Sequence, residues 1–155
     1  MNATGASAAK DVIREINEGC LLMRTRLISR VMTAVYDEGL RPFGIGSPQF
    51  ALLVIIGGME PATRAEIGRH LHQDRSTLTR NLKLILTEGW AEEIQKEASG
   101  RARPLVLTKA GKDLVRSAAP MWRVAQSRAK ALLGKDGVFA VMDMANRIMK
   151  SEPMA

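Results

Sequence analysis

The side chains best suited to chemistry lie in one short segment, DRSTLTRNLKLIL, which spans residues 74–86. Hydroxyl and basic side chains alternate there with regularly spaced leucines, and those of interest are Ser76, Thr77, Thr79, Arg80 and Lys83. Arg can bind a guanine edge through two hydrogen bonds, Ser and Thr can contact base edges or phosphates, and Lys neutralises phosphate. These residue types at this spacing favour recognition of a nucleic acid.

The segment also has the pattern of an amphipathic helix. At 3.6 residues per turn one face is apolar and holds Leu78, Leu82, Ile85 and Leu86. The polar side chains fall on the opposite face. Asp74 is a preferred N-cap, and Gly89 should follow the end of the helix. The helix N-terminus is expected to direct backbone N–H groups toward phosphate. The alternative is an ordinary solvated face.

The whole chain is basic, with a net charge of +7 and a pI of about 10.1. The charge is regional. Residues 64–84 hold five basic and two acidic side chains, and residues 108–134 hold six basic side chains against Asp113 alone, whereas the first 41 residues nearly balance. Such patches are typical of proteins that bind nucleic acids or anionic membrane surfaces.

The composition is that of a globular chain of 155 residues, enough for one domain or for a small domain with helices shared with a partner. The single cysteine, Cys20, excludes an intrachain disulfide framework and indicates a reducing compartment. No apolar run approaches the ~20 residues of a membrane span. The N-terminal residues lack an apolar signal core. We therefore expect a cytoplasmic protein without a membrane partner.

A long helix is predicted from Lys10 to about Gly39. Its apolar stripe has helical spacing over about seven turns and consists of Val12, Ile16, Cys20, Met23, Leu27, Val31 and Ala34. A helix of this length cannot bury its whole stripe on one small domain. The economical explanation is a second copy of the chain.

Three shorter elements follow. A helix is expected to begin with Ser47 as N-cap and Pro48 at its first position, and to end at the glycine pair 57–58. Thr63 should cap a short helix, RAEIGRHL. Residues 72–73 then form a tight turn before the helix that Asp74 caps.

Residues 90–107 read as a two-stranded hairpin, with Trp90, Ile94, Leu105 and Leu107 supplying an alternating pattern. Thr108 should cap a long helix that reaches about residue 133, which Pro120 should bend or break. A last short apolar helix follows residues 134–137. Two helices around a tight turn, followed by a hairpin, predict a mainly α fold with a small β-hairpin: a winged helix-turn-helix.

The hairpin tip, SGRARP, supplies two further candidate contacts, Arg101 and Arg103. Alternating residues of an extended strand project to the same side. A guanidinium that enters a narrow minor groove gains from its negative potential. Taken alone, two exposed arginines in a loop are the commoner explanation, but the preceding helix favours a DNA-binding wing.

These segments resemble the MarR family of transcriptional regulators. The resemblance extends from about Cys20 to Leu133, and DRSTLTRNL followed by GRARPLVLTKAG is its most specific part. It implies a homodimer whose recognition helices and wings bind a pseudo-palindromic double-stranded DNA operator. Residues 10–46 and 108–150 would form the helical dimerisation region, and residues 47–107 the DNA-binding domain. It also implies a repressor that a small aromatic or phenolic ligand releases from DNA.

By position, the resemblance makes Ser76, Thr77, Thr79, Arg80 and Lys83 recognition-helix contacts, and Arg101 and Arg103 wing contacts. The chain departs from the family at Ser99, where an acidic residue often braces the wing arginine. The position that peroxide-sensing members use for cysteine falls near Leu22, not at Cys20. We expect Cys20 to be a packed apolar residue.

Other classes of function have weaker support. The sequence contains no phosphate-binding loop, no dinucleotide fingerprint and no nucleophile set, so we expect no enzyme and no cofactor. His70, His72 and Asp74 do not make a metal site, because the two histidines lie on different sides of a helix. The remaining alternatives are a non-enzymatic winged-helix adaptor for protein partners and a redox-responsive regulator that uses Cys20.

Overall fold

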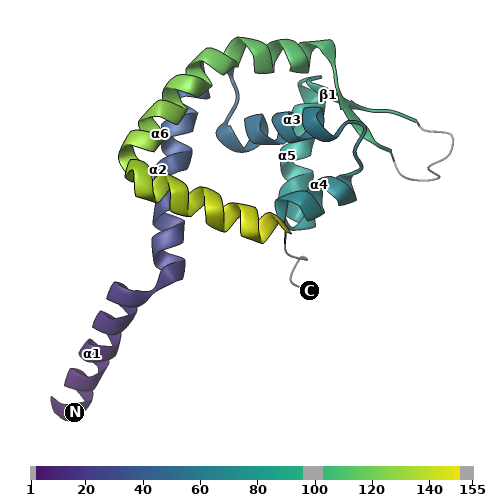
Figure 1. The fold of residues 1–155 in the computed structure, drawn as a ribbon. Helices are drawn as coiled ribbons and strands as arrows, with labels where there is room; N and C mark the ends of the chain where they lie inside the picture. Colours follow the sequence, from purple (N-terminus) through teal and green to yellow (C-terminus); the bar gives the residue numbers. More distant parts are fainter. Residues whose placement is uncertain (1–2, 96–102, 151–155) are drawn as a thin grey trace. The chain divides into compact units, whose positions relative to one another are not determined.

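The computed structural model describes residues 3–95 and 103–150. It confirms a mainly α fold with one small β-hairpin (Figure 1). The elements in chain order are α1 (Ala3–Gly19), α2 (Leu21–Leu40), the short 3-10 helix η1 (Arg41–Phe43), α3 (Ser47–Met59), α4 (Arg64–Leu71), α5 (Arg75–Thr87), β1 (Ala91–Glu93), β2 (Leu105–Leu107) and α6 (Lys109–Lys150).

Residues 1–34 and 35–155 form two separate compact units. In the first unit, the prediction of one unbroken helix from Lys10 is wrong. The helix starts at Ala3 and is interrupted at Cys20, although the amide of Cys20 still donates to the Ile16 carbonyl at 3.0 Å. Gly19 precedes the interruption, and glycine weakens a helix because its backbone is so free in the unfolded chain.

The apolar stripe of the first unit is open to solvent. Val12, Ile16 and Leu27 keep 51%, 52% and 47% of their surface exposed. Cys20 is half-buried rather than packed into a core. Exposed apolar surface on this scale marks an interaction site.

In the second unit, α3 is the central helix and contacts α5, β2 and α6 (Figure 1). Its apolar residues face several directions, as expected for a helix that other elements surround. The core joins α3 to α5, α6 and the hairpin. Its largest fully buried side chains are Leu40, Leu52, Leu53, Ile56, Ile67, Leu82, Ile85 and Leu105.

Local capping positions the helices of this unit. Thr63 forms the predicted capping box with Glu66, and Asp74 accepts the amides of Ser76 and Thr77. The prediction for α3 needs correction, because Gly46 is its N-cap. Asp37, at the end of α2, accepts the Ser47 amide at 2.6 Å and so supplies a cap that Ser47 itself does not.

The hairpin and α6 fit together through a glycine. β1 and β2 pair antiparallel, with Ala91 opposite Leu107. Thr108 caps α6 by accepting the Gly111 amide at 3.1 Å, while its own hydroxyl donates to the Gly89 carbonyl at 2.7 Å. A Cβ at Gly111 would lie 1.9 Å from the carbonyl oxygen of Trp90. Only glycine permits this approach of α6 to the hairpin.

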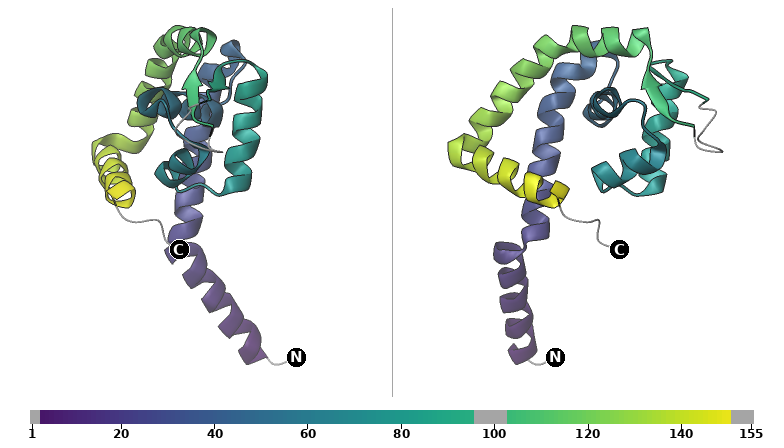
Figure 2. Two further views of the ribbon diagram at one scale, coloured as in Figure 1. Left: turned by 90° about the vertical axis from the view of Figure 1, so that its right-hand side faces the viewer. Right: turned by 45° about the vertical axis from the view of Figure 1, so that its right-hand side comes forward.

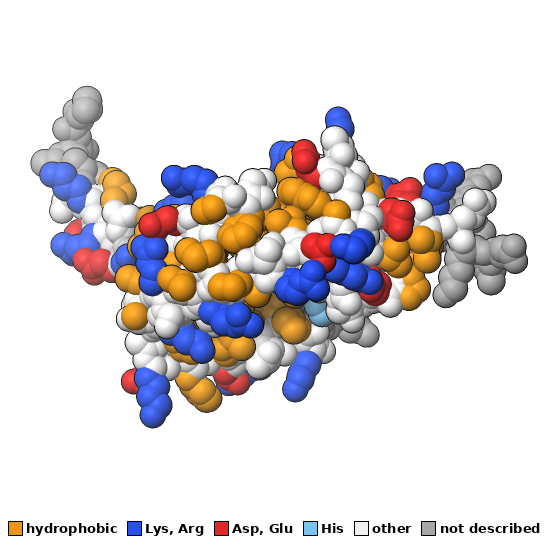
Figure 3. Space-filling view, turned by 90° about the horizontal axis from the view of Figure 1, so that it is seen from above, with side chains coloured by type: hydrophobic (Ala, Val, Ile, Leu, Met, Phe, Trp, Pro, Cys, Tyr) orange, Lys and Arg blue, Asp and Glu red, His pale blue; other side chains and the backbone are white. Residues whose placement is uncertain are grey.

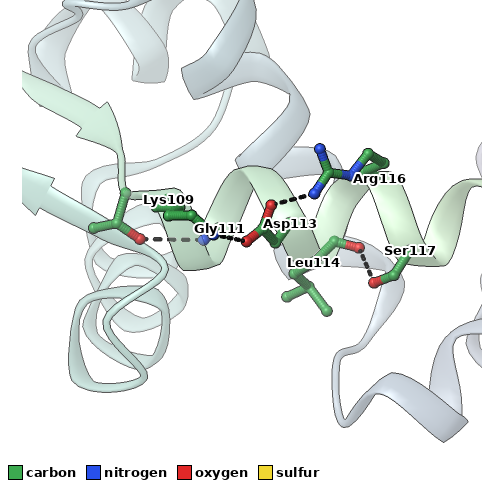
Figure 4. A network of polar contacts seen from close by, with 7 residues as sticks. Lys109, Gly111, Asp113, Leu114, Arg116 and Ser117 are labelled. Atoms are coloured by element: carbon green, nitrogen blue, oxygen red, sulfur yellow. Dashed lines mark hydrogen bonds and ion pairs between the residues drawn. The ribbon is translucent and has the colours of Figure 1, made fainter.

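The first turns of α6 carry an exposed charge cluster (Figure 4). Asp113 pairs with Lys109 at 2.7 Å and with Arg116 at 2.6 Å. The hydrogen bond from Lys109 holds the pKa of Asp113 below its usual value. Both pairs lie within one helix and are exposed, so they contribute little to stability.

The predicted end of α6 near residue 133 corresponds to a kink rather than to a separate loop. Gly134 adopts φ 68° and ψ 170°, and the helix changes direction there (Figure 2). Pro120 lies within the helix, which curves over this part of its course without a break (Figure 2). Beyond the kink, Phe139, Met142 and Ile148 are more than half exposed.

Within the described residues no single helix is long and apolar enough to cross a membrane, and only the bent pair 21–43 and 47–59 meets that test, by length and composition alone.

Candidate nucleic-acid interface

Helix α5 separates its apolar and polar faces as the sequence predicts. Leu78, Leu82 and Ile85 are buried, and Leu86 is partly buried against the same core. On the opposite face four of the five candidate contacts are exposed, and Thr77 is half-buried. The candidates therefore share one face of a helix that its other face fixes to α3 and α4.

Two hydroxyls of this face already donate hydrogen bonds within the helix. Ser76 Oγ donates to Asp74 Oδ1 at 2.6 Å, and Thr79 Oγ1 donates to the Arg75 carbonyl at 2.7 Å. With their protons engaged, both oxygens can only accept a further hydrogen bond, and both residues are exposed. They suit the amino groups of adenine or cytosine better than phosphate, which only accepts hydrogen bonds.

The helix N-terminus differs from the expectation that its amides would face phosphate. The amides of Ser76 and Thr77 donate to Asp74 Oδ1 at 3.0 and 2.9 Å. The hydrogen bond from the Ser76 hydroxyl, with those from Thr77, holds the pKa of the Asp74 carboxyl far below its usual value. Asp74 thus remains ionised and occupies the donors that a phosphate would need.

The cations of the face are available to an external anion. Arg80 and Lys83 are exposed, as is Arg75 in the first turn of α5, and in the described part of the chain none of them pairs with an acidic side chain. On the face of the molecule that Figure 3 shows, Lys and Arg side chains lie among hydrophobic ones. The polar face of α5 combines unpaired cations with short polar side chains.

The wing is described in part. Arg101 lies outside the described residues, whereas Arg103 is exposed at the start of the returning strand. Glu93 of β1 binds the Arg64 guanidinium through Oε1, at 2.6 Å from Nη2 and 3.2 Å from Nε. Its second oxygen, Oε2, lies 4.0 Å from Nη1 of Arg103.

Glu93 is a residue whose role the sequence did not reveal. Neighbouring residues of a strand face opposite sides, and Glu93 is half-buried while Glu92 is exposed. Glu93 thus places an acidic side chain beside a wing arginine, although Ser99 stands where the family often has an acid. No local sequence pattern could have revealed this role, because Glu93 and Arg64 are 29 residues apart in the chain and only the fold brings them together.

A cavity of about 530 Å³ opens between the end of α2, α3 and α6. Its lining includes Tyr36 of α2, Phe50 and Val54 of α3, and Val115 and Trp122 of α6. The Tyr36 hydroxyl donates to Gln126 Oε1, and burial raises the pKa of Tyr36. No residue of this cavity was predicted, because it arises only where three distant segments pack.

Among the described residues, no group of three His, Cys, Asp or Glu side chains is arranged to hold a metal ion.

The chain resembles known proteins both in sequence and in fold. The profile of the MarR family matches residues 43–102, which run from η1 to the wing. The structure of the Mycobacterium tuberculosis transcriptional regulator MosR in complex with DNA superposes with a TM-score of 0.71 and 31% identity, over 82% of this chain and 92% of MosR. The chain belongs to the MarR family.

Two further relatives extend the comparison. The uncharacterized HTH-type transcriptional regulator YwoH of Bacillus subtilis is 33% identical over 81 residues, which are 52% of this chain and 58% of YwoH. The chain thus spans little more than half the length of this relative. The HTH-type transcriptional repressor Rv2887 of Mycobacterium tuberculosis is 27% identical over 115 residues, or 74% of this chain and 81% of the repressor.

A mutant of Escherichia coli MarR complexed with operator DNA shares the fold, with a TM-score of 0.76 over 86% of this chain and 96% of that protein. At 20% identity this likeness concerns the fold alone.

Proposed function

We propose that this MarR-family chain is a transcriptional repressor that binds a pseudo-palindromic DNA operator as a homodimer. Residues 47–107 would bind DNA, and residues 10–46 and 108–150 would form the dimerisation region. A small aromatic ligand would release the operator. MosR, at 31% identity, has been crystallised with DNA, and the M. tuberculosis relative Rv2887 is named a repressor.

The observation that carries the proposal is the two-faced character of α5. Its apolar face is fixed in the core, and its exposed face presents Arg80 and Lys83 beside the hydroxyl oxygens of Ser76 and Thr79. A helix of this kind fits the major groove, where the bases display donors and acceptors. A helix for protein contacts would more often expose apolar or aromatic side chains, so the adaptor alternative has less support.

Dimerisation is supported by the apolar surface that a single chain leaves uncovered. Ile16 and Leu27 of the stripe are about half exposed, and Phe139 and Met142 beyond the kink of α6 are more than half exposed. A second copy would remove both surfaces from water. In a two-fold dimer the two α5 helices would meet successive major grooves, roughly 34–36 Å apart.

Ligand control is supported by the cavity between α2, α3 and α6. Its size and apolar lining are typical of small-molecule sites. It also has a short connection to α5, because Gln49 Nε2 of α3 donates to Asn81 Oδ1 of α5 at 3.1 Å. A ligand that moves α3 would therefore alter the placement of the reading helix. Such control requires that the ligand bind the two placements with different affinity.

A titration tests the proposal. The DNA immediately upstream of the protein's own gene is labelled, and fluorescence anisotropy compares its binding with that of a shuffled sequence of equal length. We expect preference for the upstream DNA by at least about 10³-fold at physiological salt. The Leu27→Glu variant, which places a charge in the exposed stripe, should sediment as a monomer and lose that preference. Equal binding of both DNAs by the wild type would overturn the proposal.

A further inference from the structure

The cavity between α2, α3 and α6 has a chemical character that narrows its ligand. Its walls are built from aliphatic and aromatic side chains, chiefly Leu40, Phe50, Val54, Ile55, Val115 and Trp122. Among the residues that the structure describes, none that lines the cavity is a Lys, Arg or His. These walls therefore offer no positive charge to balance an anion.

A charged group close to the lining acts against an anion as well. Asp37 accepts the amide of Ser47 at 2.6 Å, and Ser47 lines the cavity, so the carboxylate is one hydrogen bond away from a lining residue. Burying an organic carboxylate here would remove its water without supplying a counter-charge, and that cost is large.

The polar groups of the wall define the rest of the ligand. The Tyr36 hydroxyl donates its proton to Gln126, so its oxygen can act only as a hydrogen-bond acceptor toward a ligand. A ligand that reaches this oxygen should bring a neutral donor, such as a phenol hydroxyl or an amide N–H. An apolar cavity of about 150 Å³ holds one benzene ring. The 530 Å³ here therefore accommodates two fused rings.

We propose that the cavity binds uncharged aromatic molecules that carry a hydrogen-bond donor, and that it rejects aromatic carboxylates of the same shape. The proposal rests on the proposed function only for its regulatory consequence. It differs from the salicylic acid complex of the M. tuberculosis MarR-family protein Rv2887, because the ligand there is an acid.

The test uses a matched pair of probes, 2-naphthamide and 2-naphthoate, which differ mainly in charge at pH 7. Isothermal titration calorimetry of the full chain, without DNA, measures each affinity. We expect the amide to bind at least about tenfold more tightly than the carboxylate. Equal or tighter binding of 2-naphthoate, or no binding of either probe, would overturn the proposal.

A charge introduced at the rim should reverse the preference. Val54 lines the cavity and is 49% exposed, so a lysine there can extend its stem along the wall and keep its ammonium hydrated. Val54→Lys should raise the affinity for 2-naphthoate by about tenfold. The control Val124→Lys adds the same charge at a 51% exposed site of α6 outside the lining, and should change neither affinity. A similar gain in both variants would contradict the assignment.

A second variant, Ala119→Phe, covers the case in which Val54→Lys does not fold. It fills the cavity from α6 with an apolar side chain and should abolish 2-naphthamide binding. Unchanged binding would show that the probe occupies another site. Because calorimetry is performed without DNA, the ligand class is tested even if the chain binds no operator. Tight 2-naphthamide binding that leaves operator affinity unchanged would support the ligand class and remove only the proposed release.

Discussion

Glu93 binds the Arg64 guanidinium at 2.6 Å, and the same carboxylate faces Arg103 of the wing at 4.0 Å. One acidic side chain of β1 thus connects the start of α4 to the wing. We expect Glu93→Gln to weaken operator binding about two- to fivefold, the effect of losing a partly exposed ion pair. Binding to random DNA should become slightly stronger, because a negative charge is removed near the phosphates. Anisotropy titrations with both DNAs measure the change.

Glu92→Gln is the matched control, since it removes the same charge from the exposed side of the same strand. It should strengthen binding to both DNAs equally and leave their ratio unchanged. If the two variants behave alike, Glu93 acts through charge alone and does not position the wing.

Arg80 provides the second prediction. It is exposed at the middle of the polar face of α5 and has no acidic partner among the described residues. Arg80→Ala should reduce operator binding by about 1–3 kcal/mol if the guanidinium contacts a base edge. A gel-shift series on operator and random DNA separates the possibilities. An equal loss on both DNAs would make Arg80 a phosphate contact.

The N-cap Asp74 should make the stability of α5 depend on pH. Hydrogen bonds from Ser76 and Thr77 lower the pKa of its carboxyl in the folded chain, below the unfolded value of about 3.9. The ionised cap therefore contributes stability that is fully present above this unfolded value and is lost as the pH falls toward the lower, folded pKa. Asp74→Asn, which can still cap, should unfold with less dependence on acid. Thermal unfolding followed by circular dichroism measures this, and identical acid profiles would contradict it.

Gly111 allows the close packing of α6 against the hairpin to be tested. Its substitution by Ala places a Cβ 1.9 Å from the Trp90 carbonyl oxygen, so the hairpin or α6 must shift. We expect a loss of about 1–3 kcal/mol in the free energy of unfolding in urea, or failure to fold. Gly58→Ala is the control, because a Cβ there meets no atom within 4 Å. It should be neutral or should stabilise α3 by about 0.5–1 kcal/mol.

The sequence predicted what depends on neighbouring residues. The caps at Thr63, Asp74 and Thr108 and the apolar face of α5 depend on spacings of a few residues, and all appear in the structure. The predictions that failed concern features that depend on contacts between distant segments, or on small differences in local helix stability. Gly46 replaces Ser47 as the cap of α3 because Asp37 of another helix supplies the acceptor.

The same distinction applies to the candidate site. The residue types of the α5 face could be read from the chain, whereas the role of Glu93 depends on how α4 packs beside the hairpin. The interruption at Cys20 also escaped prediction, because an apolar period does not report the cost of a glycine within it. The cavity between α2, α3 and α6 has no local sequence pattern, because its lining comes from three distant segments.

A dimer of this chain should present two copies of α5 to one operator. Hydroxyl-radical footprinting on the DNA upstream of the protein's own gene can show this. We expect two protected half-sites related by two-fold symmetry, with centres about 10–10.5 base pairs apart or a multiple of that spacing. Their protection should disappear together in Arg80→Ala. A single protected half-site, or uniform protection without sequence preference, would show that the chain does not bind an operator in this way.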